Sequence, residues 1–333
     1  MAQPTKYSYE LTISSSPHIH APVTTQVIMA DVLIALTPAL LGAVAYFGLR
    51  ALTVTLVSAA ACLFFEWAYC RLLKTECQTY DLSALVTGVL LAFVCPVTIP
   101  YWTIILGDFF AIVVVKMLFG GLGKNLVNPA LAGRAFLFSW PAIMSTWVQV
   151  GRANAVGIFH TADAVTAATP LASLHQGLLP QQTLWDCFFG NVGGCIGETS
   201  GALLLVGFVY LLVRRVITPR IPLVFVGTVA LLTFLLPMGQ DRLVWMGYQV
   251  FSGGLLLGAI FMATDYVTSP LTPKGQILYA AGCGVLTVLI RYLGSYPEGV
   301  SYAILCMNCC CVLLDRVGRP TPFGAPGKGG AGK

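Results

Sequence analysis

The stretch 27–48, VIMADVLIALTPALLGAVAYFG, sets the class of this protein. It contains a single charged side chain, Asp31. About 20 mainly apolar residues are enough for a helix to cross the hydrocarbon core of a bilayer. The whole chain agrees, because 57% of its 333 residues are hydrophobic and only 9% are charged, whereas a soluble domain carries roughly 25% charged residues. The sequence therefore predicts an integral membrane protein.

Ten segments have the length and apolar content of a spanning helix, and they predict an all-α membrane fold. The third segment is short and stops at Cys95-Pro96, and the fifth starts at Asn128-Pro129 and contains Pro141. Both are candidates for broken or re-entrant helices, because proline interrupts helical hydrogen bonding. The ten segments are approximately 27–48, 51–73, 82–97, 101–119, 128–146, 197–214, 221–238, 245–264, 276–293 and 300–317.

The basic residues predict the orientation of these segments. With the N-terminus in the cytoplasm, fourteen of the eighteen Lys and Arg side chains fall on the inner side and four on the outer side. This bias predicts cytoplasmic termini and an outer loop at 147–196. The net charge of +5 is explained by topology and calls for no nucleic acid. The segment 1–25 lacks the apolar core of a cleavable signal peptide, so the first span is expected to direct its own insertion.

Five spans on each side of the 147–196 loop suggest an internal duplication. An odd number of spans in each half inverts the halves relative to each other in the membrane. TGVLL at 87–91 resembles SGGLL at 252–256, and the two lie in corresponding spans, the third and the eighth. We therefore expect a cytoplasmic N-terminal segment, a first five-helix repeat, an outer loop, a second five-helix repeat and a disordered cytoplasmic tail, at 1–26, 27–146, 147–196, 197–317 and 318–333.

Inverted-repeat membrane proteins place their binding sites near the midplane, where helices are interrupted. The clearest interruptions in this sequence are GGLGKNLVNPALAGR at 120–134 and FMATDYVTSPLTPKGQ at 261–276. Both fall toward the cytoplasmic side in the predicted topology.

The outer loop contains DAVTAATPLASL at 163–174. Thr169 follows two alanines, whose small side chains leave its hydroxyl sterically accessible to another enzyme. Local sequence also fits a simpler role, in which Asp163 or Thr166 caps a short helix by accepting from its first backbone N–H groups.

DAVTAAT fits the recognition pattern of flavin transferases, which is Asp, two variable residues, Ser or Thr, Gly or Ala, Ala and then the modified Thr. Asp163 and Thr166 are the recognition residues of this match, and Thr169 is the attachment site. Further motifs resemble one family across nearly the whole chain, which contains the D subunit of the Rnf complex and the B subunit of the sodium-pumping NADH:quinone reductase. These motifs are SSPHIH (15–20), DLSALVTGVLLA (81–92), GGLGKNLVNPALAGRAFLFSWP (120–141), ATPLASL (168–174) and FMATDYVTSP (261–270).

The resemblance implies FMN joined to Thr169 through a phosphoester, with electron transfer performed by the flavin rather than by a catalytic residue of the chain. It also implies other Rnf-type redox subunits as partners, a flavin transferase for maturation, and transport of Na+ or H+ across a bacterial or archaeal cytoplasmic membrane. The segment before the first span, 1–26, is short. This is more similar to the Rnf branch, because the quinone reductase branch usually carries a longer N-terminal extension.

A second, non-covalent flavin, riboflavin, is implied by the quinone reductase branch. The polar residues expected near it are Asn125, Asn128 and Asp265, because amide and carboxylate groups can hydrogen-bond the edge of the ring. The alternative is structural, since Asn128-Pro129 can start a helix and Asp265 can cap one.

Ionisable residues inside spans are costly and are functional candidates by default. Arg134 is expected to pair with a carboxylate, to support a cofactor, or to snorkel to the inner interface. Asp108 lies near the middle of its span, with a structural hydrogen-bonded role as the alternative. Lys116 is two turns further on, too far for a direct bond along one helix. The candidates for the ion path are Asp31, Glu66, Asp108 and Asp265.

The cysteines offer no metal site in this sequence. Cys306, Cys309 and Cys310 share a helical face in CMNCCC at 306–311, but the chain has no second close pair to complete four ligands. Core packing is therefore the preferred interpretation. Cys187 and Cys195 lie in the outer loop, where a pairing between them has no further support.

Two other functions stay open at the level of sequence. One is the quinone-reducing relative, and the other is a secondary transporter, because an inverted repeat with broken helices also suits solute transport. The chain has no nucleotide-binding glycine loop, so it is not expected to oxidise NADH or ferredoxin alone.

Overall fold

A computed structural model describes residues 23–75, 79–148, 169–238, 241–294 and 298–317. Within these ranges the chain is helical, and the one extended pairing is an isolated antiparallel bridge between Pro96 and Cys195. The all-helical prediction is confirmed for this part of the chain. Asp163 and Thr166 lie outside the described residues, as do most of segment 1–26 and the tail beyond 317.

The first group of helices, which we call the N-terminal bundle, extends from α1 to α6. Thr24 caps α1 by accepting from the backbone N–H of Val27, and Gly48, at φ 79°, reverses the chain before α2. The members are α1 (Thr25–Phe47), α2 (Leu49–Leu73), the 3-10 helix η1 (Thr79–Asp81), α3 (Ser83–Phe93), α4 (Tyr101–Phe109), the π-helix η2 (Phe110–Met117), α5 (Pro129–Leu137) and α6 (Pro141–Met144).

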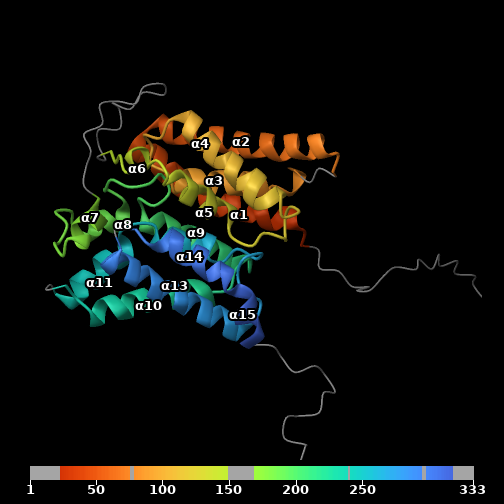
Figure 1. The fold of residues 1–333 in the computed structure, drawn as a ribbon. Helices are drawn as coiled ribbons and strands as arrows, with labels where there is room; N and C mark the ends of the chain where they lie inside the picture. Colours follow the sequence, from red (N-terminus) through yellow and green to blue (C-terminus); the bar gives the residue numbers. More distant parts are fainter. Residues whose placement is uncertain (1–22, 76–78, 149–168, 239–240, 295–297, 318–333) are drawn as a thin grey trace, which may run out of the picture.

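The second group, the C-terminal bundle, extends from α9 to α15 and lies beneath the first in Figure 1. Two short helices, α7 (Pro170–His175) and α8 (Leu184–Phe189), connect the groups at one end of the molecule. The members are α9 (Gly201–Val213), α10 (Arg220–Leu235), α11 (Arg242–Phe251), α12 (Leu255–Leu257), the π-helix η4 (Gly258–Met262), α13 (Pro273–Leu293), α14 (Val300–Cys309) and α15 (Cys311–Val317).

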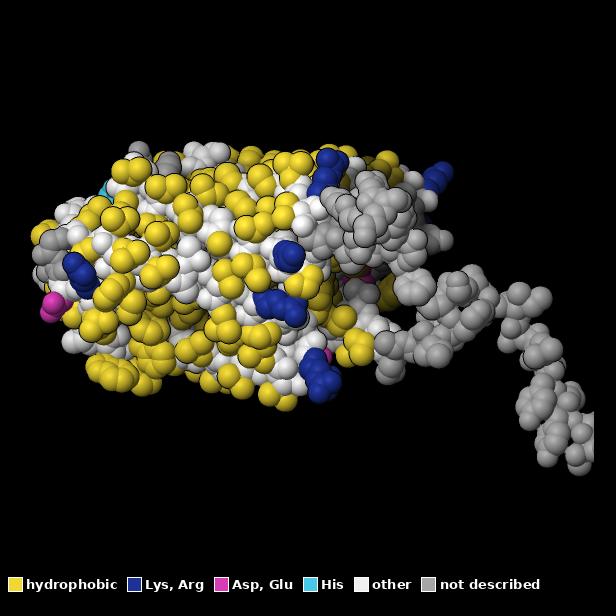
Figure 2. Space-filling model, turned by 90° about the horizontal axis from the view of Figure 1, so that it is seen from below, with side chains coloured by type: hydrophobic (Ala, Val, Ile, Leu, Met, Phe, Trp, Pro, Cys, Tyr) yellow, Lys and Arg dark blue, Asp and Glu magenta, His cyan; other side chains and the backbone are white. Residues whose placement is uncertain are grey.

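Several of these helices suit a bilayer. Among the described residues, α1, α2 and α13 are each long and apolar enough to span one, and two bent pairs bring the total to five if each pair is one span. Figure 2 shows a face covered by hydrophobic side chains, with most of its few Lys and Arg side chains toward one end. Exposure of such an apolar surface to water is unfavourable, so this is a multi-pass membrane protein.

Each predicted span contains helix, but several are not continuous. The segment 128–146 is split into α5 and α6, and the helix predicted at 82–97 stops at Phe93. The segments 245–264 and 300–317 are each bent by 62° at a break. The interruptions predicted at 120–134 and 261–276 correspond to non-helical connections between helices, at 118–128 and 263–272. The break inside the predicted span 245–264 lies at 252–254.

The expectation of core packing for the C-terminal cysteines is wrong. Cys306, Cys309 and Cys310 are exposed on the surface of α14 rather than packed in the core. The physical reason is that a lipid-facing surface and a protein core are equally apolar, so hydropathy does not separate them. Cys187 and Cys195 are separate buried free thiols.

The two bundles meet where α1 packs against α9. Gly207 of α9 lies so close to α1 that an added Cβ would collide with the backbone carbonyl of Ala35, and it would also lie 3.0 Å from the ring of Phe261. Small residues allow such backbone approach in membrane helices, where packing and hydrogen bonds replace the hydrophobic driving force.

We predict that Gly207→Ala destabilises the protein by about 1–3 kcal/mol, because overpacking forces α1 and α9 apart. Gly227→Ala in α10 is the matched control, because no heavy atom lies within 4 Å of its added Cβ. Thermal unfolding of the purified variants in detergent measures both. Equal melting temperatures for the two variants would contradict the close contact.

Candidate functional site

Thr169 lies at the start of α7. Its backbone is extended, at φ −69° and ψ 149°, and its hydroxyl accepts a hydrogen bond from the backbone N–H of Ala172 at 3.2 Å. Pro170 occupies the first helical position, where its fixed φ is favourable. Thr169 is therefore the N-cap of α7. The local sequence predicted such a capping role for Asp163 or Thr166.

Thr169 lines a cavity, here the Thr169 cavity, which encloses about 840 Å³ including the part open to its surroundings. Most of the walls are apolar, and Cys195, Glu198 and Glu298 supply polar groups. The lining residues are Phe138, Pro141, Met144, Ser145, Trp147, Thr169, Pro170, Leu171, Val192, Gly193, Gly194, Cys195, Glu198, Thr199, Phe251, Ser252, Gly253 and Glu298.

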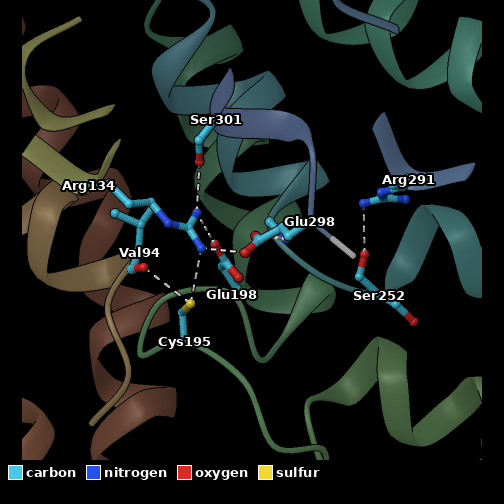
Figure 3. Close-up of polar contacts among 9 residues, drawn as sticks. Val94, Arg134, Cys195, Glu198, Ser252, Arg291, Glu298 and Ser301 are labelled. Carbon is cyan, nitrogen blue, oxygen red and sulfur yellow. Dashed lines mark hydrogen bonds and ion pairs between the residues drawn. The ribbon is translucent and has the colours of Figure 1, made fainter. Parts of the chain in front are cut away.

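A buried charge cluster lies beside this cavity (Figure 3). Arg134 of α5 donates through Nη1 to Glu198 Oε1 at 3.2 Å and to Ser301 Oγ at 2.9 Å. Its Nη2 pairs with Glu298 Oε2. The side chain of Arg134 is 2% exposed, against 5% for Glu198 and 14% for Glu298. Of the alternatives open for Arg134, pairing with a carboxylate is confirmed.

The same cluster holds the break between α11 and α12. Glu298 Oε1 accepts from the backbone N–H of Gly254 at 3.2 Å. Arg291 of α13 donates to the carbonyl oxygens of Gln249 at 2.5 Å and Ser252 at 3.3 Å. Buried irregular backbone must find such partners, because no lipid can hydrogen-bond it. The break is therefore held by Arg291 and Glu298, and Glu298 also borders the Thr169 cavity.

Cys195 connects this region to the N-terminal bundle. Its thiol donates to the carbonyl oxygen of Val94 at 3.2 Å, and the backbone N–H of Ile196 donates to the carbonyl of Cys95 at 3.0 Å. The backbone N–H of Gly197 donates to Phe93 in the same way, at 2.8 Å. The segment after α3 and the segment before α9 are thus joined directly beside the cavity.

Thr183 offers a useful comparison with Thr169, because it caps α8 in the same connecting region. Its hydroxyl accepts from the backbone N–H of Asp186 at 3.2 Å and donates to the Asp186 carboxylate at 2.7 Å. Hydrogen bonds to the carboxylate from the Thr183 hydroxyl and the Thr183 backbone N–H lower the pKa of Asp186 below its usual value. Thr183 has the chemistry of Thr169 but does not line the Thr169 cavity.

A second cavity, the Asn125 cavity, brings together all three residues expected around a second flavin. Asn125, Asn128 and Asp265 line it, in a space of about 750 Å³ including the open part. Asn128 caps α5 through the backbone N–H of Ala130, at 3.0 Å, so it does start a helix. Asp265 Oδ2 accepts from Thr268 Oγ1 at 3.0 Å within a turn. Asn125 Oδ1 is buried without a hydrogen-bond partner in the described structure.

Of the ion-path candidates, Asp31 lies where α1 meets α9, whereas Asp108 and Glu66 both lie within the N-terminal bundle. Asp31 pairs with Arg214 at 3.1 Å and accepts from Tyr210 at 2.9 Å. Asp108 accepts from Ser58 Oγ at 2.7 Å. Its hydrogen-bonded surroundings are those expected of a structural residue, although its Oδ2 is buried and unpartnered in the described residues.

Glu66 lies on the same side of α2 as Ser58, two turns further along. It pairs with Lys116 at 2.7 Å. Lys116 therefore bonds across helices rather than to Asp108, as the spacing along its own segment predicts.

Comparison with known proteins gives the family. A family model for the NQR2, RnfD, RnfE family matches residues 12–324. The chain belongs to the NQR2, RnfD, RnfE family. Within it, the chain is similar to three curated relatives. The D subunit of a Na(+)-translocating ferredoxin:NAD(+) oxidoreductase complex from Acetobacterium woodii is 46% identical over 318 residues, covering 94% of this chain and 95% of the relative.

Two further relatives are also named as the D subunit of an ion-translocating oxidoreductase complex. The D subunit of a proton-translocating ferredoxin:NAD(+) oxidoreductase complex from Clostridium ljungdahlii is 43% identical, covering 94% of this chain and 96% of the relative. The D subunit of an ion-translocating oxidoreductase complex from Stutzerimonas stutzeri is 37% identical, covering 91% and 93%. The resemblance to this family, first seen in short motifs, is confirmed.

Sequence reasoning missed Glu198, Glu298 and Arg291. A signal exists for the two glutamates, because each follows a glycine or proline and stands just before an apolar helix, in GETSG (197–201) and PEGVS (297–301). Nothing local identifies them as partners of Arg134, which is 64 and 164 residues away.

We predict that Arg134→Leu costs about 3–5 kcal/mol of stability, because it leaves two buried glutamates without their partner. Glu198→Gln keeps the shape of the side chain and one carboxylate for Arg134, so its cost is expected to be the smaller. Thermal unfolding in detergent, beside the wild type, ranks the two. A milder effect for Arg134→Leu than for Glu198→Gln would contradict the central place of the guanidinium.

Proposed function

We propose that this chain is the D-type membrane subunit of an ion-translocating ferredoxin:NAD(+) oxidoreductase and that it relays electrons through FMN esterified to Thr169. The position of Thr169, which caps α7 and lines the Thr169 cavity, carries the proposal. The names of the relatives support the kind of complex. FMN, when bound, accepts and passes on electrons, and the protein fixes its place and potential.

The residues around the cavity fit a flavin. Phe138, Trp147 and Phe251 are aromatic lining residues, which suit a flat ring. Arg134 brings a permanent positive charge next to the cavity, offset by Glu198 and Glu298. Its Nε is buried without a partner in the described residues. The cluster has a net charge of −1 when both glutamates are ionised and of zero when one glutamate is protonated. Its net charge contributes to the electrostatic potential in the cavity.

The Asn125 cavity is proposed as the place of a non-covalent riboflavin. Its largely apolar lining includes Ile28, Leu90 and Phe261. The unpartnered Asn125 Oδ1 can accept a hydrogen bond from a ligand in this cavity. Asn128 and Asp265 then act mainly by shaping the cavity, since their side chains are already engaged.

We further propose ten spans in two inverted five-helix repeats, at 27–146 and 197–317, with the 147–196 loop outside and both termini cytoplasmic. The packing of α2 on α3 and α4 parallels that of α10 on α11 and α13, which supports the repeat. Exposed Arg71 and Lys74 at the end of α2 support the orientation. The remaining partners are the other subunits of the complex, lipid, and a flavin transferase for maturation.

A fluorescence experiment tests the flavin. We expect the denatured wild-type band to fluoresce in a gel when the protein is expressed with a flavin transferase, and the Thr169→Ala band to be dark. Thr183→Ala is the matched control and is expected to stay bright, because it removes an equivalent helix cap outside the Thr169 cavity.

The other outcomes are informative as well. Three dark bands, with the transferase active on another substrate, would exclude a covalently bound flavin and favour a secondary transporter. Three bright bands would keep the flavin and place its attachment on a residue other than Thr169.

A further inference from the structure

Glu198 and Glu298 form a pair of carboxyl groups at the wall of the Thr169 cavity (Figure 3). One oxygen of each lies within 4.8 Å of the other, and Cys195 Sγ lies within the same distance of both. The two groups converge on Gly254, where an added Cβ would touch an oxygen of each. Two carboxylates that share one buried site repel each other, so such a pair binds a proton more readily than a single carboxylate does.

The two carboxyl groups differ in the donors that they receive. Glu298 is engaged through both oxygens, because Oε2 pairs with Arg134 Nη2 and Oε1 accepts from the backbone N–H of Gly254 at 3.2 Å. Glu198 accepts through Oε1 from Arg134 Nη1 at 3.2 Å. Hydrogen-bond donors stabilise the ionised form of a carboxyl group. A proton on the pair is therefore expected on Glu198, with Glu298 ionised as the partner of Arg134.

The positive charges around the pair determine when it needs a proton. Arg134 alone leaves the two carboxylates with one negative charge in excess, which Arg291 of α13 offsets from nearby. A Cβ added at Gly253 would lie 3.6 Å from Arg291 Nη2 and 4.0 Å from Glu298 Cγ. The two guanidinium groups and the two ionised carboxylates together are neutral. One electron added in the cavity would leave a negative charge without a partner, which is costly in buried surroundings.

A metal ion is another cation that Cys195, Glu198 and Glu298 could share. Arg134 already lies among these side chains, because it donates to both carboxylates and its Nη2 lies 3.6 Å from Cys195 Sγ. The guanidinium thus occupies the position in which a metal ion would gather the three ligands. The thiols of Cys195 and Cys95 are further ionisable groups near Glu198, and both are uncharged at neutral pH. A proton is therefore the cation that the pair can still accept.

We propose that Glu198 is the proton acceptor of the Thr169 cavity. It takes up one proton from the solvent, through the open part of the cavity, when one electron from a reduced iron–sulfur or flavin centre enters the cofactor. It releases the proton when the electron leaves. One negative and one positive charge arrive together, so the net charge of the cavity does not change. The role of Glu198 rests on the proposed function, because it requires a redox cofactor on Thr169.

Infrared difference spectroscopy of the purified full-length protein tests this role. The protein is made with a flavin transferase, and its FMN is oxidised and then reduced at an electrode. On reduction the wild type is expected to gain the C=O stretching band of one protonated carboxylic acid, which shifts in D2O. Glu198→Gln removes the acceptor and is expected to lose the band. Glu198→Asp keeps a carboxyl group and is expected to retain the band at a changed frequency.

Two further variants serve as controls for the infrared experiment. Asp241→Asn is the matched control, because Asp241 is exposed and does not line the Thr169 cavity. Its spectrum is expected to equal that of the wild type. Thr169→Ala lacks the proposed attachment site, so no band is expected to appear at any electrode potential.

The pH-dependence of the midpoint potential gives a second readout, which a purely structural role of Glu198 would not change. Uptake of one proton with one electron lowers the potential by about 59 mV per pH unit. Protons that bind to the flavin ring itself are common to all variants and cancel in the comparison. The one-electron step that loads Glu198 is expected to be less steep in Glu198→Gln by about this amount. Glu298→Gln removes the neighbouring negative charge, so the steep region is expected to move to lower pH.

The possible failures are distinct. A wild type that carries FMN but gains no carboxylic acid band on reduction would overturn the role of Glu198 and leave the flavin proposal standing. A band that persists unchanged in Glu198→Gln would also overturn it, because the proton would then lie on another group. A wild type without covalent FMN, seen as a dark band in the denaturing gel, would overturn the proposed function and the role of Glu198 with it.

Discussion

The burial of Arg134 is the constraint around which the centre of this protein is arranged. A guanidinium group cannot stay among apolar helices unless carboxylates and hydrogen-bond acceptors surround it. Those groups come from outside its own bundle, with Glu198 just before α9 and Glu298 and Ser301 at the start of α14. Satisfying one side chain therefore brings together segments that are distant in sequence, and the Thr169 cavity forms where they meet.

The broken helices follow from the same requirement. At 252–254 the chain leaves helical geometry, with Gly253 at φ 71°. The backbone groups released there are taken up by Glu298 and Arg291. Position 254 requires glycine, because a Cβ at this position would collide with the Glu198 carboxylate. Charged side chains and irregular backbone thus satisfy one another, and neither could be buried alone.

Much of this arrangement could be predicted from sequence, because lipid imposes simple rules on composition and length. The apolar segments identified the helices, the motif around Thr169 singled out a residue that lines a cavity, and the burial cost of Arg134 called for a carboxylate partner. The identity of that partner lay beyond sequence reasoning, because only tertiary contacts bring Glu198 to Arg134. The break at 252–254 falls at Ser-Gly-Gly, within a segment whose overall hydropathy predicts one continuous span. The exposure of Cys306 could not be predicted either, since lipid-facing and core-facing residues have the same hydropathy.

The close packing of α1 on α9 limits how the molecule can move. A transporter that works by rocking one bundle over the other must separate them, but here that motion would part Arg134 from Glu198 and Glu298, at about 3–5 kcal/mol for a broken buried pair. It would also open the contact at Gly207. Separating the bundles is therefore costly. Motions that keep these contacts are local, at the scale of a side chain or of a helix break.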